Sequence, residues 1–593
     1  MKKISLSQPF QILFIIFVCL GVFYPSLFGE VTSIDDHRLI TNLYNAKEID
    51  ITTLFFRKSS GNYYRPLLYS TYLLEKKFLG LHEFFMHFNN VLLHTMSVIM
   101  VFFLIKNFLK YFSKESNETY IPFFISLLFA LHPINTESVN WISGRTDVLA
   151  SLFVFISLYM LFKSELKKKL WILGAGFFYL LGLLSKEVAI GLFPVVIILL
   201  FIRNHRKDMS LSEKIYSIGV FVFFTVLYFY MRSGFVLEHD SGLKNVITAG
   251  RDNPSFWISL RGIIKATGFY LKKLFLPLPL NFAIVNVSTK TYLTLGILTT
   301  LSFVVCNILL IFKKHFNEKL LFLSFWFIFS VIFYIPALPL VLAKITWTPL
   351  AERYLYISSL GSAFIVVYYL ATRLKERWFF ISISVILILC GFITVERNII
   401  WQKNITLWAD TVKKSPDFAP ARNDYAIALI KEGRIEEAKK QLKLASKLAN
   451  DRSANPDINL AILESPYNLD NAERIVTQQI NNPELKEKFK IRALEKFISI
   501  KTSKLLDEKI PEEKKKKIYR ELISGYNTLF TFRQDGFYKY RIGQLYIALG
   551  EKRKALENFK EAARLSPNEY FSPAARKLVK KLEAELADKA RES

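Results

Sequence analysis

The chain has 593 residues, of which 52% are apolar, and a formal net charge of +28. The charge does not indicate a nucleic-acid partner, because many of the basic residues stand in short loops between apolar runs, where they act as topology signals beside anionic lipid. Nothing indicates a disulfide framework or a CxxC metal site, since Cys19, Cys306 and Cys390 all lie inside apolar runs.

Apolar runs of roughly 17–25 residues recur up to about residue 395, and each is long enough to cross a hydrocarbon core of ~30 Å. No such run follows Trp401. The first run follows Lys2 and Lys3 and resembles a signal peptide, but it is long and lacks an A-x-A-like cleavage site. We therefore expect a retained first membrane helix.

The positive-inside rule orients these runs. With Lys2 and Lys3 in the cytoplasm, residues from about 29 to 84 form a long outer loop, and the next basic loops fall inside. The segment 256–276 decides on which side of the membrane the later loops and the tail lie. It is apolar but carries four charges that are costly at a helix centre: Arg261, Lys265, Lys272 and Lys273. We expect it to lie on the outer surface or to re-enter, which predicts about eleven spans and a C-terminal tail outside.

The first outer loop contains two adjacent carboxylates, Asp35 and Asp36, next to His37. In a membrane-facing cavity, desolvation and mutual repulsion would raise the pKa of one carboxyl, which suits a general base. The second carboxylate could orient an acceptor or bind a cation. Taken alone, an Asp-Asp pair is more often a solvated turn.

Other ionisable residues also fall on the outer side of this topology, at the boundaries of apolar runs, where such residues are functional candidates by default. Four are basic, and guanidinium and ammonium groups could hold a lipid-linked phosphate as it leaves: Arg65, Arg145, Lys186 and Arg353. Five could support them: His132, Glu137, Asp147, Glu187 and Glu352. His37, His132 and Glu137 match no metal-ligand spacing, so we expect no metal cofactor, although a divalent ion stays possible.

Past Trp401, Pro and Gly separate short amphipathic helices of period 3.6. The spacing of small and large residues from Tyr425 to Ala438 matches a tetratricopeptide helix–turn–helix, and the stretch from Gly543 to Ala562 matches it better. A weaker match lies at 460–472. Such repeats present a concave surface to a peptide or partner, although they could merely brace the membrane part. We therefore expect two domains, 1–400 in the membrane and 401–593 as an extracytoplasmic repeat domain.

The motifs together resemble the TMTC family, the transmembrane and tetratricopeptide-repeat O-mannosyltransferases, and their bacterial relatives. The resemblance rests on Asp35-Asp36, the segments 64–67, 132–137, 144–150, 184–187 and 352–356, in family order, and the repeat tail. It implies an all-α polytopic bundle of the GT-C type, an acid in the first outer loop, a polyprenyl- or dolichyl-phosphate sugar as donor, and inversion of the anomeric centre. It makes Asp35 or Asp36 the base that activates the acceptor. The tail has about two clear repeats instead of a long array, which is a departure from the animal members.

The leading hypothesis is an enzyme that moves a hexose, mannose being favoured, from a polyprenyl-phosphate donor to an extracytoplasmic hydroxyl. The acceptor would be a protein Ser or Thr or a glycan, recruited by the repeats. The alternative is a catalytically silent membrane scaffold that assembles partner proteins. A transporter would carry charges along several helix midplanes and an internal repeat of its spans, and neither is visible. Residue usage suggests a bacterial inner membrane protein with its tail in the periplasm.

Overall fold

The structure is a computed structural model that divides into two units, residues 1–415 and 416–593. It describes residues 7–45, 54–55, 64–112, 120–163, 168–205, 210–236, 256–285, 287–312, 318–338, 350–449, 455–507 and 509–592. Parts of the predicted first outer loop, residues 46–53 and 56–63, lie outside these residues. The described residues are almost entirely helical, as the sequence predicts, with a single isolated β-bridge between Ile284 and Leu350.

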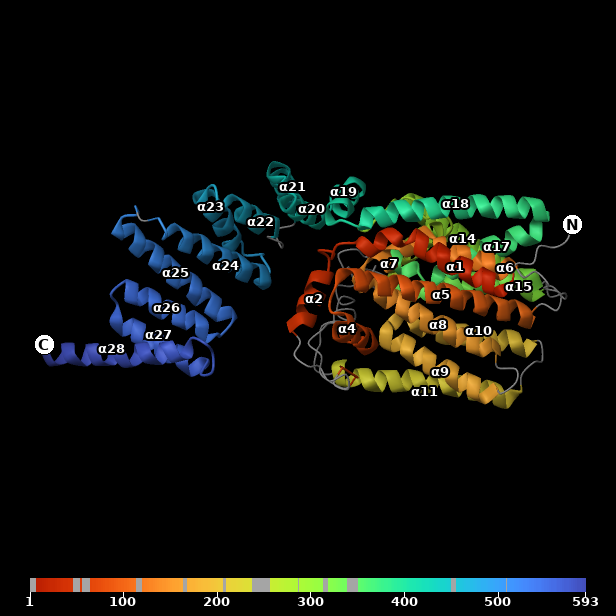
Figure 1. The fold of residues 1–593 in the computed structure, drawn as a ribbon, viewed down its shortest axis with the longest axis horizontal. Coiled ribbons are helices and arrows are strands. Elements are labelled where there is room, and N and C mark those ends of the chain that lie inside the picture. Colours follow the sequence, from red (N-terminus) through yellow and green to blue (C-terminus); the bar gives the residue numbers. More distant parts are fainter. Residues whose placement is uncertain are drawn as a thin grey trace. The chain divides into compact units, whose positions relative to one another are not determined.

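The first unit is a bundle of mostly long apolar helices (Figure 1). Those in its first half are α1 (Gln8–Val22), α2 (Asp36–Asn45), α4 (Pro66–Leu79), α5 (Glu83–Phe112), α6 (Tyr120–Leu131), α7 (Thr136–Asn140), α8 (Arg145–Lys163) and α9 (Lys168–Ser185). The second half contains α10 (Leu192–His205), α11 (Leu211–Val236), α13 (Phe256–Phe275), α14 (Thr289–Phe312), α15 (Glu318–Tyr334), α17 (Ser358–Arg373), α18 (Glu376–Trp401) and α19 (Asn404–Lys414). Short 3₁₀ turns join several of them, including η4 (Glu187–Gly191) and η6 (Glu352–Leu355).

Five of the described segments are long and apolar enough to cross a membrane: Glu83–Phe112, Ile142–Lys163, Leu211–Arg232, Lys319–Ala337 and Glu376–Trp401. Four shorter apolar helices accompany them: Gln8–Val22, Tyr120–Leu131, Lys169–Ser185 and Glu187–Ile202. Helices suit a bilayer because they satisfy their backbone hydrogen bonds internally, where no water could do so. The protein is therefore a polytopic helical membrane protein, and the number of eleven spans stays a prediction.

An aromatic cluster lies near the C-terminal end of α5. Phe108 of α5 lies within 5.3–5.7 Å of rings from three other helices, namely Phe162, Phe322, Phe325, Trp326 and Phe364. Ring pairs at these separations add attraction beyond the packing of their area. This cluster ties α5 to α8, α15 and α17.

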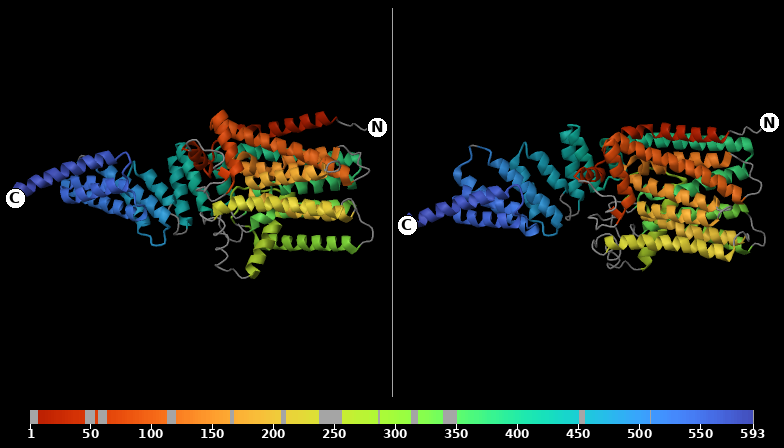
Figure 2. Two further views of the ribbon diagram at one scale, coloured as in Figure 1. Left: turned by 90° about the horizontal axis from the view of Figure 1, so that it is seen from below. Right: turned by 60° about the horizontal axis from the view of Figure 1, so that its bottom comes forward.

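The charged segment that decides the topology forms α13, which is absent from the segments apolar enough to span. In the left view of Figure 2, α13 runs across the direction of the long helices. One of its four charges, Lys273, is buried at 2% exposure and contacts Glu352 through Nζ and Oε1 at 2.6 Å. That α13 lies on the membrane surface or re-enters stays a prediction, which rests on its charges.

The second unit consists of paired amphipathic helices, α20 (Ala419–Lys431) to α28 (Ser572–Glu592). The remaining members are α21 (Ile435–Leu448), α22 (Asn455–Glu464), α23 (Leu469–Ile480), α24 (Glu487–Lys504), α25 (Glu512–Phe532), α26 (Gly536–Ala548) and α27 (Lys552–Leu565). The three predicted repeats correspond to the pairs α20–α21, α22–α23 and α26–α27. Gly433 and Gly550 occupy the turns of the first and last pairs with φ of 74° and 79°, which glycine adopts without strain.

Candidate functional site

The predicted site residues gather at one end of the membrane bundle, where Figure 1 places α2, α4 and α7. Residues 132–147, which comprise the connection between α6 and α8 and the first turn of α8, contact most of them. Ser143 binds Asp36, Glu137 binds Arg353, and Asp147 binds Lys186. This segment forms the short helix α7 and two 3₁₀ turns, which offer backbone and side-chain groups in several directions. We call it the hub segment.

The two aspartates differ in their surroundings. Asp36, the first residue of α2, is fully buried. Its Oδ1 accepts hydrogen bonds from the Ser143 amide at 3.0 Å and hydroxyl at 2.5 Å, and its Oδ2 accepts one from Thr32 Oγ1 at 2.8 Å. Burial raises the pKa of Asp36 to about 6, and these hydrogen bonds oppose the rise. Asp36 thus attaches the first outer loop to the hub segment.

Asp35 is exposed, and its side chain makes no hydrogen bond or ion pair with any residue that the structure describes. Its carboxylate therefore keeps its acceptor capacity for another molecule. A general base must come within hydrogen-bond reach of the proton that it removes. Of the two predicted bases, Asp35 is the more accessible.

Arg145 is buried at 1% exposure, and residues of α4 and α5 occupy its guanidinium. Its Nε, Nη1 and Nη2 donate to Asn90 Oδ1 at 2.7 Å, Glu75 Oε2 at 2.7 Å and the Met86 carbonyl at 2.9 Å. The guanidinium also stacks 4.3 Å from the centre of the Tyr72 ring. With its donors used in this way, Arg145 joins α4, α5 and α8.

Lys186 and Arg353 each pair with an acid of the hub segment. Lys186 Nζ lies 2.5 Å from Asp147 Oδ1, and Arg353 Nη1 lies 2.5 Å from Glu137 Oε1. The Arg353 amide donates to Glu137 Oε2 at 3.2 Å, and its guanidinium lies 5.1 Å from the Trp141 ring centre. Burial raises the pKa of Glu137, and the Arg353 guanidinium opposes that rise.

The fourth predicted cation, Arg65, precedes α4 and pairs with Glu187 at 3.1 Å. Glu187 also lies 3.8 Å from Arg232 at the end of α11, a residue that sequence reasoning did not single out. Burial lowers the pKa of Lys186, the Asp147 carboxylate opposes this change, and the positive charge of Arg65 adds to it. Arg353 acts on Lys186 in the same direction, so the three cations share one electrostatic environment.

Four cations in this cluster, Arg65, Lys186, Arg232 and Arg353, face three carboxylates, Asp147, Glu137 and Glu187. The side-chain exposures of Arg65, Lys186 and Arg353 are 18%, 11% and 13%, against 1% for Arg145. An incoming anion can therefore approach these three but not Arg145. We call Arg65, Lys186, Arg232 and Arg353 the cation cluster.

The last two supporting residues bind the region around α13. Glu352 Oε1 accepts from Lys273 and from the Asn281 amide at 3.0 Å. His132 Nε2 lies 3.0 Å from the Leu274 carbonyl, and its Nδ1 accepts from the Ile134 amide. Both side chains therefore attach the end of α13 to the site. The described residues contain no group of three or more His, Cys, Asp or Glu suited to hold a metal ion.

Several residues that complete this network were not predicted as site residues from the sequence: Thr32, Glu75, Asn90, Ser143, Arg232 and Lys273. Ser, Thr and Asn are common in any loop, and only their partners distinguish them here. Glu75 and Lys273 carry a usable signal, because each is a charge in an amphipathic or apolar helix that burial makes costly unless it is paired.

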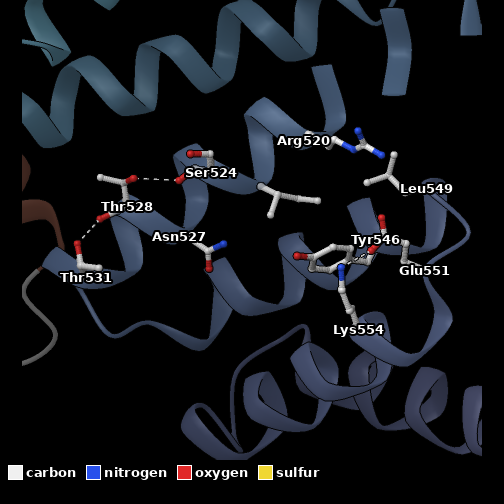
Figure 3. A pocket seen from close by; sticks show the side chains of 10 residues that line it. Arg520, Ser524, Asn527, Thr528, Thr531, Tyr546, Leu549, Glu551 and Lys554 are labelled. Atoms are coloured by element: carbon white, nitrogen blue, oxygen red, sulfur yellow. Dashed lines mark hydrogen bonds and ion pairs between the residues drawn. The ribbon is translucent and has the colours of Figure 1, made fainter. Parts of the chain in front are cut away.

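The repeat unit contains a groove of about 550 Å³ lined by α25, α26 and α27 (Figure 3). One wall is a polar row along α25 that includes Arg520, Ser524 and Asn527, and the opposite wall contains Tyr546 and Lys554. The lining mixes hydroxyl, amide and charged groups with few apolar ones. Such a surface suits the polar backbone of an extended chain better than an apolar ligand.

Comparison with known proteins supports both units. A tetratricopeptide-repeat family model matches residues 538–569, which confirms the repeat predicted from Gly543 to Ala562, the pair α26–α27. Protein O-mannosyl-transferase F38B6.6 of Caenorhabditis elegans is 25% identical over 75% of this chain and 64% of its own length. Tmtc2 of Xenopus laevis is 34% identical over 27% of this chain and 19% of its own, and human TMTC2 is 31% identical over 30% and 22%.

The chain thus spans about two-thirds or less of each of these curated relatives. Among solved structures, the APC/C hetero-tetramer Cut9–Hcn1 aligns with 81% of this chain and 98% of its own at 13% identity, with a TM-score of 0.18, which carries no conclusion about the fold. These sequence relatives are all described as protein O-mannosyl-transferases, and the repeat match falls in the tail. The chain is a relative of the TMTC family, as its motifs predict.

Proposed function

We propose that the protein is a membrane glycosyltransferase that moves a mannosyl residue from a polyprenyl-phosphate donor to a hydroxyl outside the cytoplasm. The observation that carries this proposal is one arrangement at one end of the bundle. The loop that carries the exposed Asp35 is tied to the hub segment through Asp36 and Ser143. Two members of the cation cluster, Lys186 and Arg353, are tied to the same segment through Asp147 and Glu137. The descriptions of the relatives favour mannose and a protein acceptor.

The donor phosphate would bind at Arg65, Lys186 and Arg353. The four cations of the cluster face three carboxylates, which leaves one net positive charge. The side chains of the cations also retain some exposure. Arginine and lysine donors can hold phosphate oxygens and stabilise the charge that develops on them as the bond to the sugar breaks. The lipid chain would extend along the apolar helices.

Asp35 would remove the proton from the acceptor hydroxyl as its oxygen attacks the anomeric carbon. The new carbon–oxygen bond forms on the face opposite the phosphate, and the bond from the anomeric carbon to the phosphate oxygen breaks. The polyprenyl phosphate leaves with the electron pair, and the configuration of the anomeric carbon inverts. Arg145 and Asp36 would keep the site assembled without touching the substrates.

The groove on the repeat unit would hold an extended segment of the acceptor protein, with Ser or Thr as the attacking residue. A glycan acceptor would use the same catalytic end and leave the groove without a role. We propose the inner membrane of a bacterium as the location, with the repeats in the periplasm. Because the cation cluster can stabilise the leaving phosphate, transfer is expected to continue in a metal chelator.

The test is an assay of sugar release and transfer from radiolabelled polyprenyl-phosphate mannose by the full chain in detergent. Asp35→Asn is expected to lower the rate by roughly 100-fold or more, the usual contribution of a general base, while leaving the melting temperature unchanged. Glu83→Gln, an exposed acid at the start of α5, is the matched control and should retain the wild-type rate. Asp36→Asn should instead lower the melting temperature, since it weakens the contact with Ser143.

Two outcomes would contradict the proposal. Full activity of Asp35→Asn would remove Asp35 from the chemistry. Absence of turnover with mannose, glucose and galactose donors, together with no thermal shift from the lipid phosphate, would favour the membrane scaffold.

A further inference from the structure

The segment that follows the last apolar helix returns to the first outer loop and runs beside it. Asn398 Nδ2 donates to the Val22 carbonyl at 2.9 Å, and Gln402 Nε2 donates to the Pro25 carbonyl at 2.7 Å. The Gln402 carbonyl then accepts from the Glu30 amide at 2.8 Å. The two segments run in the same direction through these contacts, although about 370 residues of sequence separate them.

Asn404, the first residue of α19, makes the densest set of contacts with the loop. Its Nδ2 donates to Glu30 Oε2 at 2.9 Å and to the Val31 carbonyl at 3.0 Å, and its Oδ1 accepts from the Ser33 amide at 2.9 Å. Its own amide donates to Glu30 Oε2 at 3.0 Å. The side chain is 7% exposed, so both of its polar atoms are used inside the protein.

One turn further along α19, Trp408 makes a second contact. Its Nε1 donates to Ser33 Oγ at 2.8 Å, and the indole is fully buried, 5.6 Å from the Phe282 ring. At the other end of α19, Ser415 binds Asn281 and the Ala283 carbonyl. Asn281 in turn donates its amide to Glu352. The helix is therefore held at both ends by residues around the site.

These contacts matter because Asp35 has no side-chain partner of its own among the described residues. Its position depends on its neighbours: Ser33, which α19 holds, and Asp36, which the hub segment holds. We propose that Asn404 and Trp408 are positioning residues that fix the loop of Asp35 for transfer; this inference rests on the function proposed above. The catalytic unit then includes α19, beyond residue 400 where the apolar sequence ends.

The same contacts involve the sequence Asn404-Ile405-Thr406, which has the N-x-T form of an N-glycosylation acceptor. The amide nitrogen that a glycan would modify is buried and donates to Glu30 and Val31. In the folded chain this triplet therefore serves the loop and is closed to modification.

The experiment compares Asn404→Ala and Trp408→Phe with Lys403→Ala, an exposed neighbour, in the full chain. Hydrogen exchange of the backbone at residues 30–36 should accelerate at least several-fold in the first two variants and stay unchanged in the third. With the mannose donor, kcat should fall by roughly 10- to 100-fold, since small displacements of a reacting group cost that much, while KM for the donor changes by less than about twofold, because the cation cluster is untouched. Trp408→Phe keeps the buried ring and removes one hydrogen bond, so it tests the idea even if Asn404→Ala folds poorly.

Rescue separates positioning from a general loss of stability. In Asn404→Asp a new carboxylate faces Glu30, and transfer should fall; adding Glu30→Gln restores a donor between the two side chains and should recover much of kcat. Unchanged exchange in both Asn404→Ala and Trp408→Phe would overturn the anchoring itself. Faster exchange with an unchanged kcat would overturn the positioning role alone, and faster exchange in a chain with no turnover at all would count against the proposed function while leaving the anchor standing.

Discussion

Arg145 and Arg353 are both arginines near an acid at a membrane boundary, yet burial gives them different capacities. The guanidinium of Arg145 has three directed acceptors and a stacked ring, and 1% of the side chain is exposed. Arg353 keeps 13% exposure and lies with Lys186 and Arg65. Exposure, and not residue type, therefore decides which of them a phosphate can reach.

Arg145→Lys is expected to destabilise the membrane unit. A lysine keeps the charge but lacks the planar fork that binds Asn90, Glu75 and Met86 together. Breaking a buried pair costs about 3–5 kcal/mol when a charge is left alone, and a lysine that keeps one contact should lose part of that. Thermal unfolding in detergent measures the effect, with the exposed Arg373→Lys as control. A normal melting temperature combined with weaker donor binding would instead place Arg145 among the donor ligands.

Asp424 of α20 is a second buried acid, in the repeat unit. One of its oxygens accepts from Asn423 at 3.0 Å and the other has no partner among the described residues. Burial raises its pKa from 3.8 to about 7. Between these values the folded state binds more protons than the unfolded state, so the free energy of unfolding falls as pH rises, by up to about 1.4 kcal/mol per pH unit, and levels off above pH 7.

Asp424→Asn should therefore stabilise the repeat unit at pH 8 and change little at about pH 3, where the wild-type carboxyl is mostly neutral in both the folded and the unfolded state. Hydrogen exchange of peptides from α20 and α21 at several pH values measures this dependence. A wild-type unit whose protection does not vary between pH 5 and pH 8 would show that Asp424 titrates normally.

At the scale of elements, close approach of helices explains the small residues of the repeat motif. A side chain built at Gly543 of α26 would place its first carbon 2.8 Å from Phe559 Cε1 of α27, well inside van der Waals contact. Phe559 is itself fully buried. The glycine of the repeat motif is thus required because α26 and α27 pack closely at this position.

Gly543→Leu should destabilise the last repeat by about 1–3 kcal/mol, the usual cost of overpacking a filled core. Ala548→Leu, an exposed position on the same helix, is the matched control for the added volume. Local hydrogen exchange across α26 and α27 reports the change, and equal protection in the two variants would mean that the helices can separate without loss.

At the scale of the whole molecule, the topology argument predicts that the tail and the catalytic end face the same side of the membrane. A cysteine introduced at the exposed Asp417 should react with a membrane-impermeant reagent in sealed vesicles whose outer face is the non-cytoplasmic one. A cysteine at the exposed Lys110, at the end of α5, should react only after permeabilisation. The reverse pattern would put the tail, and with it the proposed transfer, in the cytoplasm.

Much of this protein could be predicted from sequence. The all-helical architecture, with apolar helices followed by a tetratricopeptide-like tail, is confirmed, because run length and helical period are local properties of the sequence. The domain boundary at residue 400 stays a prediction. The repeat formed by α26 and α27 is confirmed by the family comparison. The ionisable residues at the boundaries of apolar runs could be identified for the same reason. The number of spans depends on whether α13 crosses the membrane, which its charges alone do not decide.

Only the tertiary structure decided which of these residues pair. The paired residues are far apart in the sequence, and no local pattern connects them. The separation is 39 positions for Lys186 and Asp147, 216 for Arg353 and Glu137, and 371 for Asn404 and Ser33. It also separated buried Asp36 from exposed Asp35, and buried Arg145 from the cation cluster. The sequence by itself determined the kinds of groups present and the side of the membrane predicted for them. Their exposure and partners follow from how distant helices pack, because burial is a property of the assembled fold.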